Sequence, residues 1–223
     1  MKLKHWLSVM LLACAAVAGV SQAQSERELV AGRDYDLVQP AQPTADSGKV
    51  EVIEFFSYAC PHCFHFEPLI GKWLQKLPAD VDFKRMPLSA GPAWNPTAKL
   101  FFALDAMGIE SRLHGDIFNA IHGSKTLNPN DEAAISDWIA KRGVDAGKFN
   151  IAYGFSGPRL QQMQRTFAAY GVTGVPTIVV DGKYRIRNEA IKSYDDLLAL
   201  TDAVIAKARA EHPKSKPTGK PRK

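Results

Sequence analysis

The chain has 223 residues, of which 46% are hydrophobic and 23% charged, a composition typical of a globular protein with one or two domains. Lys2 and Lys4 contribute two positive charges to the net charge of +5, and the residues from Lys207 onward contribute six, so residues 24–206 carry −3. Because the basic residues are confined to the two ends, this charge distribution argues against a nucleic-acid-binding surface.

A secretory signal peptide is predicted over residues 1–23. Two lysines precede an apolar run over residues 7–20, and Ser21-Gln22-Ala23 then places small residues at the spacing of a cleavage site. The apolar run is shorter than the ~20 residues that a membrane-spanning helix needs. We therefore expect export of the chain and removal of the leader.

Residues 24–49 form a short segment ahead of the first strong pattern. Residues 33–38 are predicted as an edge strand, and Pro40, Pro43 and Gly48 interrupt the chain after it. The segment is too short for a separate dimerisation domain, so we expect a monomer.

The first strong strand pattern covers residues 50–57. Its nearly continuous hydrophobicity predicts a central strand that is covered on both faces. Apolar residues three to four apart then predict a helix over about 61–77, and residues 82–86 are predicted as a second, parallel strand. These elements predict a right-handed β-α-β unit and so an α/β protein.

From about residue 93 to 164 the hydrophobic pattern is helical. It contains several short stretches that end at glycines, and Asn130 is expected to cap a helix over residues 131–142. A longer helix is predicted over about 156–170. Strand patterns lie on both sides of this region, which predicts a compact helical module inserted into an α/β domain.

A second α/β segment closes the folded part of the chain. Residues 178–180 and 183–186 are predicted as two strands joined by a hairpin turn at Asp181-Gly182. Ser193, with Asp196 three positions later, is expected to begin the last helix.

The motif Cys60-Pro61-His62-Cys63 stands where the central strand gives way to a helix. Pro61 fits the first helical position, where a missing N–H costs nothing. The free N–H groups and the dipole of the first turn then favour a thiolate at Cys60 and lower its pKa. His62 would favour the thiolate further, unless it is only an exposed spacer. Cys63, one turn on, can close a disulfide with Cys60, and a stabilised Cys60 thiolate makes that disulfide a stronger oxidant.

Other uses of the cysteine pair fit the sequence less well. The third cysteine, Cys14, lies in the predicted leader, so the mature chain has one pair, whereas structural zinc needs four ligands. Covalent haem needs a histidine directly after the second cysteine, and position 64 is Phe. A structural disulfide across so small a loop would contribute roughly 2 kcal/mol, against about 3 kcal/mol for a loop of about 15 residues. We therefore predict a redox-active Cys60–Cys63 disulfide with no metal and no other cofactor.

Two further places carry candidate site residues. Glu54 lies inside the apolar strand, where a carboxylate is costly without a partner or a task, so it is interpreted either as a proton relay for Cys63 or as a rim residue paired with a lysine. Pro176 precedes a strand, which is consistent either with a cis bond that leaves Val175 free to pair with an extended substrate or with an ordinary turn.

Taken together, these features resemble the DsbA family of periplasmic thiol–disulfide oxidases, within the thioredoxin superfamily. The similarity rests on an acid six residues before Cys-Pro-His-Cys, a following helix, a helical insertion and Gly174-Val175-Pro176-Thr177 before a hairpin. It implies an α/β thioredoxin fold with an inserted helical domain. The implied division is 24–92 and 165–208 for the thioredoxin-like domain, 93–164 for the insertion and 209–223 for a basic, disordered tail.

The resemblance also implies roles for individual residues. Cys60 would be the exposed nucleophile, Cys63 its buried partner, and His62 the residue that stabilises the Cys60 thiolate. Glu54 would be the buried acid, and Pro176 would follow a cis bond.

The expected function is that of a periplasmic protein dithiol oxidase. It would give its disulfide to reduced exported proteins through a mixed disulfide and be reoxidised by a membrane, quinone-linked partner resembling DsbB. A periplasmic reductase or isomerase of the same fold is the alternative, and a binding module that has lost the chemistry is a more remote one. The equilibrium potential of the cysteine pair would separate the oxidase from the reductase.

Overall fold

The computed structural model describes residues 28–46, 48–89, 91–187 and 191–212. The predicted signal peptide and most of the predicted basic tail lie outside these residues. Among the residues described, no helix is both long enough and apolar enough to cross a membrane.

One mixed five-stranded sheet forms the centre of the thioredoxin-like part, with the strand order β1-β5-β4-β2-β3. The strands are β1 (Tyr35–Leu37), β2 (Val50–Phe56), β3 (Val81–Pro87), β4 (Thr177–Val180) and β5 (Tyr184–Ile186). Strand β2 pairs in parallel with β3 and antiparallel with β4, and β1 pairs with β5 at the edge. The predicted central strand, parallel neighbour, hairpin and edge strand are thus confirmed.

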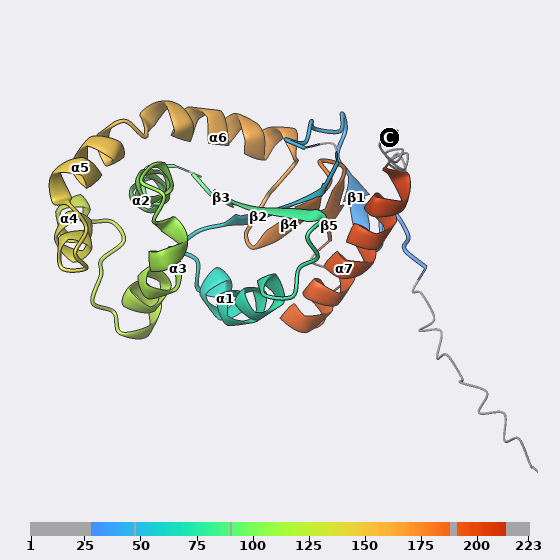
Figure 1. Ribbon diagram of the computed structural model, residues 1–223, viewed down its shortest axis with the longest axis horizontal. Helices are drawn as coiled ribbons and strands as arrows, with labels where there is room; N and C mark the ends of the chain where they lie inside the picture. The colour runs from blue at the N-terminus through green and yellow to red at the C-terminus, as the bar shows by residue number, and fades with distance from the viewer. Residues whose placement is uncertain (1–27, 47, 90, 188–190, 213–223) are drawn as a thin grey trace, which may run out of the picture.

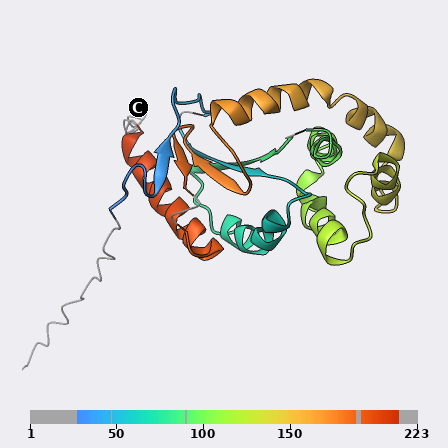
Figure 2. The ribbon, with the colours of Figure 1, turned by 180° about the vertical axis from the view of Figure 1, so that it is seen from behind.

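Helices cover both faces of the sheet (Figure 1). Helices α1 (Pro61–Leu74) and α7 (Tyr194–Glu211) lie on one face and α6 (Gly157–Ala169) lies on the other, as the reverse view in Figure 2 also shows. All seven residues of β2 are buried, and they alternate between the two layers. Val50 and Val52 belong to the cluster under α1 and α7, whereas Ile53 and Phe55 belong to the cluster under α6.

The helical insertion extends from one end of the sheet (Figure 1). Its elements are α2 (Asn95–Ala106), α3 (Glu110–Phe118), the π-helix η1 (Asn119–Gly123), α4 (Glu132–Ala140) and α5 (Ala146–Gly154). Helix α6 then returns from the insertion to the sheet. The fold is therefore the predicted α/β thioredoxin fold with inserted helices. The division of the chain at residue 164 stays a prediction, and it falls within α6.

Two details of the insertion differ from the predictions. The cap of α4 is Asp131 rather than Asn130, because the backbone is still extended at Asp131 and its carboxylate accepts hydrogen bonds from Ala133 N and Ala134 N, both at 3.0 Å. Helix α3 also does not run uniformly to Gly123. Its last turn widens into η1, where Ser124 N donates to Asn119 O at 2.8 Å across five residues.

The hairpin between β4 and β5 and the start of α7 agree with the sequence predictions. Asp181 and Gly182 both adopt positive φ, of 56° and 64°, as the predicted turn type requires. A side chain at Gly182 would also collide with the backbone carbonyl of Gln42. Ser193 caps α7 by accepting a hydrogen bond from Asp196 N at 3.1 Å.

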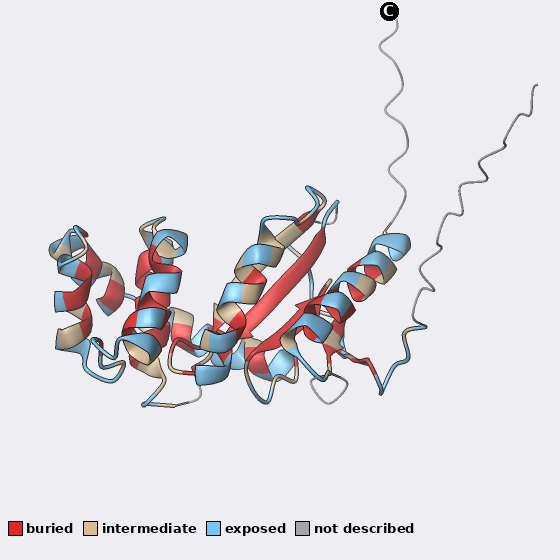
Figure 3. Ribbon diagram, turned by 90° about the horizontal axis from the view of Figure 1, so that it is seen from below, coloured by how far each residue is buried: buried red, intermediate tan, exposed pale blue. Residues whose placement is uncertain are grey.

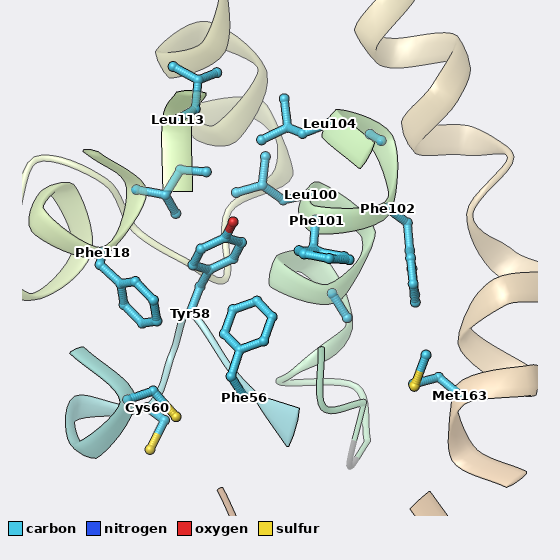
Figure 4. Close-up of a cluster of buried hydrophobic side chains, with 14 of the residues drawn as sticks. Phe56, Tyr58, Cys60, Leu100, Phe101, Phe102, Leu104, Leu113, Phe118 and Met163 are labelled. Atoms are coloured by element: carbon cyan, nitrogen blue, oxygen red, sulfur yellow. The ribbon is translucent and has the colours of Figure 1, made fainter. Parts of the chain in front are cut away.

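The larger of two buried clusters is shared by the sheet and the insertion (Figures 3 and 4). Phe55 and Phe56 from β2 belong to the same cluster as Phe101 from α2, Ile135 from α4 and Phe149 from α5. Tyr58, in the turn after β2, is 1% exposed and lies within this cluster. The turn that leads to Cys60 is therefore anchored by both parts of the chain.

Candidate active site

The turn between β2 and α1 places Cys60 at the start of a helix, as the sequence predicts. Cys60 is the extended residue before α1, and Pro61 occupies the first turn. Ser57 holds the turn from both its groups. Its carbonyl accepts from Cys60 N and its hydroxyl accepts from Ala59 N, each at 3.1 Å. The backbone thus fixes the direction in which the Cys60 side chain leaves the sheet.

The surroundings of Cys60 favour its thiolate. Its pKa is lowered to about 5, mainly by a hydrogen bond from the Cys63 thiol and also by the backbone N–H groups of Cys63 and His62 and the His62 side chain, against the opposing effect of burial. The sulfur lies 3.6 Å from Val175 O and 4.0 Å from His62 Nδ1. The expectation of an exposed Cys60 is wrong for the residue as a whole. It is only 6% exposed, because it sits in the turn beside His62 and Val175.

Cys63 has the opposite character. It is 1% exposed, and its pKa is raised by its hydrogen bond to Cys60, by burial, by the negative charge of a Cys60 thiolate and by Glu54. Both cysteines are free in the structure. The two thiols of one motif therefore divide into a stabilised thiolate and a buried thiol that keeps its proton.

His62 is exposed beside Cys60 and is held by a residue that sequence reasoning missed. The carbonyl of His62 accepts a hydrogen bond from the Tyr194 hydroxyl at 3.0 Å, and the Tyr194 ring packs against Phe66. Tyr194 stands directly after the cap of α7, and nothing in the local sequence indicates that the start of the last helix meets the first turn of α1.

The Val175–Pro176 bond is cis, as the resemblance implies, and it lies against the cysteine motif. A pocket of about 260 Å³ opens beside it. The pocket is lined by His62, Val175, Pro176, Ile191, Tyr194 and Leu197. The structure therefore brings the two sequence motifs together and adds an apolar surface from α7 and the residue ahead of it.

Glu54 is buried in β2 and is 2% exposed. It is not a rim residue paired with a lysine. Its neighbour in the β2–β3 register is Arg85, whose Nε donates to Glu54 Oε2 at 3.1 Å, and the same guanidinium reaches Glu67 on α1 at 3.3 Å. Burial raises the pKa of Glu54 despite this partner. Sequence reasoning missed Arg85, although a charged residue inside a predicted strand is a signal of the same kind as Glu54.

Within the described part of the chain, no group of three or more His, Cys, Asp or Glu side chains is arranged to hold a metal ion. The site as described consists of protein groups: two thiols, an imidazole, a carboxyl group, a guanidinium and the carbonyl before a cis proline.

Comparison with known proteins places this arrangement in a family. The family model described as "DSBA-like thioredoxin domain" matches residues 51–203. The thiol:disulfide interchange protein DsbA of Pseudomonas aeruginosa is 38% identical over 211 residues, covering 93% of this chain and 98% of the relative. The protein of the same name from Burkholderia cepacia is 42% identical over 188 residues, covering 82% and 87%.

A solved structure agrees with these sequence similarities. The crystal structure of Pseudomonas aeruginosa DsbA superposes with a TM-score of 0.76 at 39% identity, covering 82% of this chain and 95% of that one. Fold and site thus define a thioredoxin-fold thiol:disulfide oxidoreductase. The chain belongs to the DsbA family of thiol:disulfide interchange proteins.

Proposed function

We propose that the protein is a periplasmic dithiol oxidase that donates a Cys60–Cys63 disulfide to newly exported proteins. The observation that carries the proposal is the low pKa of Cys60, about 5. A stabilised thiolate is a good leaving group and favours the reduced pair, so the disulfide is oxidising, and the DsbA family itself is the standard example of this relation.

The reaction proceeds in two exchanges. A substrate thiolate attacks the Cys60 sulfur, a substrate–Cys60 bond forms, and the Cys60–Cys63 bond breaks with Cys63 taking up a proton. A second substrate thiolate then attacks the substrate sulfur of this mixed disulfide and displaces the Cys60 thiolate. The substrate has lost two electrons and become a disulfide, and the enzyme has gained them as a dithiol.

Glu54 is proposed as the proton relay for Cys63. Its burial supports this role, because a carboxyl group with a raised pKa exchanges protons closer to neutral pH than an exposed one. Its charge also acts on Cys63, whose pKa it raises. Arg85 keeps the carboxyl group oriented.

Val175 and the pocket beside it are proposed to hold the substrate. A substrate cysteine bonded to Cys60 brings its own backbone next to Val175 O, which lies 3.6 Å from the sulfur. An extended substrate can pair there as a short added strand, with a neighbouring apolar side chain in the pocket of about 260 Å³.

The remaining parts of the proposal follow from the resemblance and the predicted leader. The substrates are reduced exported proteins, and the reduced enzyme is reoxidised by a membrane, quinone-linked partner resembling DsbB. The protein acts in the periplasm as a monomer.

The test is the oxidation of a reduced peptide with two cysteines by the oxidised protein. We expect wild-type protein to oxidise the peptide, Cys60→Ala to be inactive, and Cys63→Ala to accumulate a mixed disulfide at Cys60. Oxidation by Cys60→Ala at the wild-type rate would refute the mechanism. Equilibration with a glutathione buffer tests the direction, since a pair far harder to reduce than glutathione would indicate a reductase.

A further inference from the structure

A buried histidine of the helical insertion lies between two carboxylates. His114, on α3, is 2% exposed. Its Nδ1 lies 2.5 Å from Glu110 Oε1, and its Nε2 lies 3.1 Å from Glu67 Oε2 on α1. Because a carboxylate accepts at each ring nitrogen, both nitrogens are placed to donate, which requires the imidazolium form. The carboxylates raise the pKa of His114 against the effect of burial.

The Tyr58 hydroxyl completes the surroundings of His114. It lies 2.8 Å from Nδ1 and donates to Glu110 at 3.2 Å. Figure 4 shows the Tyr58 ring beside Phe56 and Phe118, with its hydroxyl directed away from Cys60 toward the insertion. The rings of Phe56 and Phe118 also contact the imidazole, so its other neighbours are apolar.

A chain of ion pairs connects this histidine to the acid of the active site. Glu67, which accepts from His114, also pairs with Arg85 at 3.3 Å, and Arg85 pairs with Glu54 at 3.1 Å. The five charged groups come from α3, α1, β3 and β2. Three carboxylates face two cations, so the cluster carries one excess negative charge. Loss of either cation leaves a buried carboxylate without compensation.

We propose that His114 is a positioning residue for the exchange chemistry, because its imidazolium neutralises Glu67 and leaves Arg85 to Glu54, and so sets the pH at which Cys63 gives up its proton. The inference rests on the proposed role of Glu54. It assigns to the helical insertion a part in the proton balance of the cysteine pair, in addition to its packing against the turn.

The charge arithmetic gives the direction of the effect. Without the imidazolium, Arg85 has to serve Glu54 and Glu67 together, and the cluster becomes more negative. A more negative cluster binds protons more tightly, so both Glu54 and Cys63 deprotonate at higher pH. Cys60 is affected little, because its thiolate is stabilised by the Cys63 thiol, the first-turn N–H groups and His62.

The experiment isolates the step that needs deprotonated Cys63. The mixed disulfide of Cys60 with glutathione is prepared at low pH, and its resolution is followed after jumps to a series of higher pH values. In this step the Cys63 thiolate forms a bond to the Cys60 sulfur, the bond to glutathione breaks and leaves a glutathione thiolate, and the Cys63 proton passes to Glu54. We expect His114→Gln to shift the pH midpoint of resolution upward by about one unit.

Two further variants test the charge argument. Glu110→Gln removes one negative charge and keeps the imidazole, so it should shift the midpoint downward. Glu67→Gln combined with His114→Gln removes one charge of each sign and should return the midpoint toward the wild-type value. His212→Gln is the matched control, since it breaks a histidine–carboxylate pair with Asp181 at 2.9 Å that shares no residue with the cluster.

The outcomes separate the two proposals. If the wild type does not resolve the mixed disulfide, the proposed exchange chemistry fails. If the wild type resolves it and the midpoints of His114→Gln and Glu110→Gln equal that of His212→Gln, only the role of His114 is overturned. Should His114→Gln fail to fold, Glu110→Gln decides, because a purely structural role predicts no downward shift.

Discussion

At the scale of single residues, the central feature is the unequal pair of thiols. Cys60 and Cys63 are separated by two residues, yet one has a lowered and the other a raised pKa. The difference arises because each thiol acts on the other. Cys63 donates its hydrogen to the Cys60 sulfur, and the resulting negative charge opposes ionisation of Cys63. The pair therefore behaves as one unit that holds a single proton near neutral pH.

A first prediction concerns the titration of Cys60. In the reduced protein, thiolate absorbance and the rate of alkylation by iodoacetamide should both fall as the pH is lowered, with a midpoint of about 5. Cys63→Ala should raise this midpoint, because it removes the hydrogen bond that contributes most, and His62→Ala should raise it as well. His65→Ala, at an exposed position on the same helix, should leave it unchanged. A Cys60 thiol that titrates like free cysteine would contradict the prediction.

The same titration fixes the sign of the pH dependence of stability. The folded pKa of Cys60 lies below that of an unfolded thiol, so its thiolate stabilises the reduced protein fully above the unfolded pKa. This contribution is lost as the pH falls through about 5. The difference in free energy of unfolding between reduced wild type and Cys60→Ser should therefore shrink over that range.

At the scale of elements, the caps show how one residue decides where a helix begins. Asp131 caps α4 with two hydrogen bonds from backbone N–H groups, whereas Asn130 lies one residue earlier. Both residue types favour caps, so the sequence alone favours neither position. The extended backbone at Asp131 decides between them. For α7 the sequence contains one candidate, Ser193, and that prediction is confirmed.

A second prediction tests the cap of α4. Asp131→Ala should lower the free energy of unfolding by about 1 kcal/mol, because two N–H groups of the first turn lose their acceptor. Asn130→Ala is the matched control and should change it by less than about 0.5 kcal/mol. Urea denaturation of the two variants measures both values. Equal losses, or a larger loss at position 130, would show that the cap is misassigned.

The widened turn η1 is an element that no periodicity indicated. Apolar residues continue at helical spacing through Ile117 and Ile121, so a uniform helix was the simplest expectation. In the structure His122, within η1, makes a 2.8 Å hydrogen bond to Tyr58 O, and its ring stacks on Phe64. Contacts with the turn before Cys60 and with α1 thus accompany the change of helix type.

At the scale of the whole molecule, the insertion and the sheet share one buried cluster. Ile135 on α4 is fully buried in that cluster, although α4 contributes no residue to the sheet. Ion pairs cross the same boundary at His114 and Glu67. We therefore expect the insertion and the thioredoxin-like part to unfold as one cooperative unit.

A third prediction tests this cooperativity. Ile135→Ala should lower the free energy of unfolding by about 2–5 kcal/mol. The loss should be the same by far-ultraviolet circular dichroism and by Trp73 fluorescence in a background with Trp94→Phe and Trp138→Phe, because Trp73 reports on α1. Ile151→Ala, in the insertion but 63% exposed, is the matched control and should have little effect. Two separated transitions would show that the insertion unfolds independently.

The sequence by itself determined the features that depend on neighbours along the chain. The alternation of strand and helix patterns predicted the sheet with its inserted helices. The strand-to-helix junction predicted Cys60 at a helix start, where proline and free N–H groups favour a thiolate. These predictions succeed because local backbone geometry and hydrophobic periodicity are properties of short segments.

Only the tertiary structure decided which distant groups meet. It placed Val175 and Tyr194 against the cysteine motif, paired Glu54 with Arg85, and brought His114 to Glu67 across the boundary of the insertion. It also buried Cys60, which the resemblance implied to be exposed. Such contacts depend on how the helices and the sheet pack, and a buried charge is stable only beside its partner, which no single segment contains.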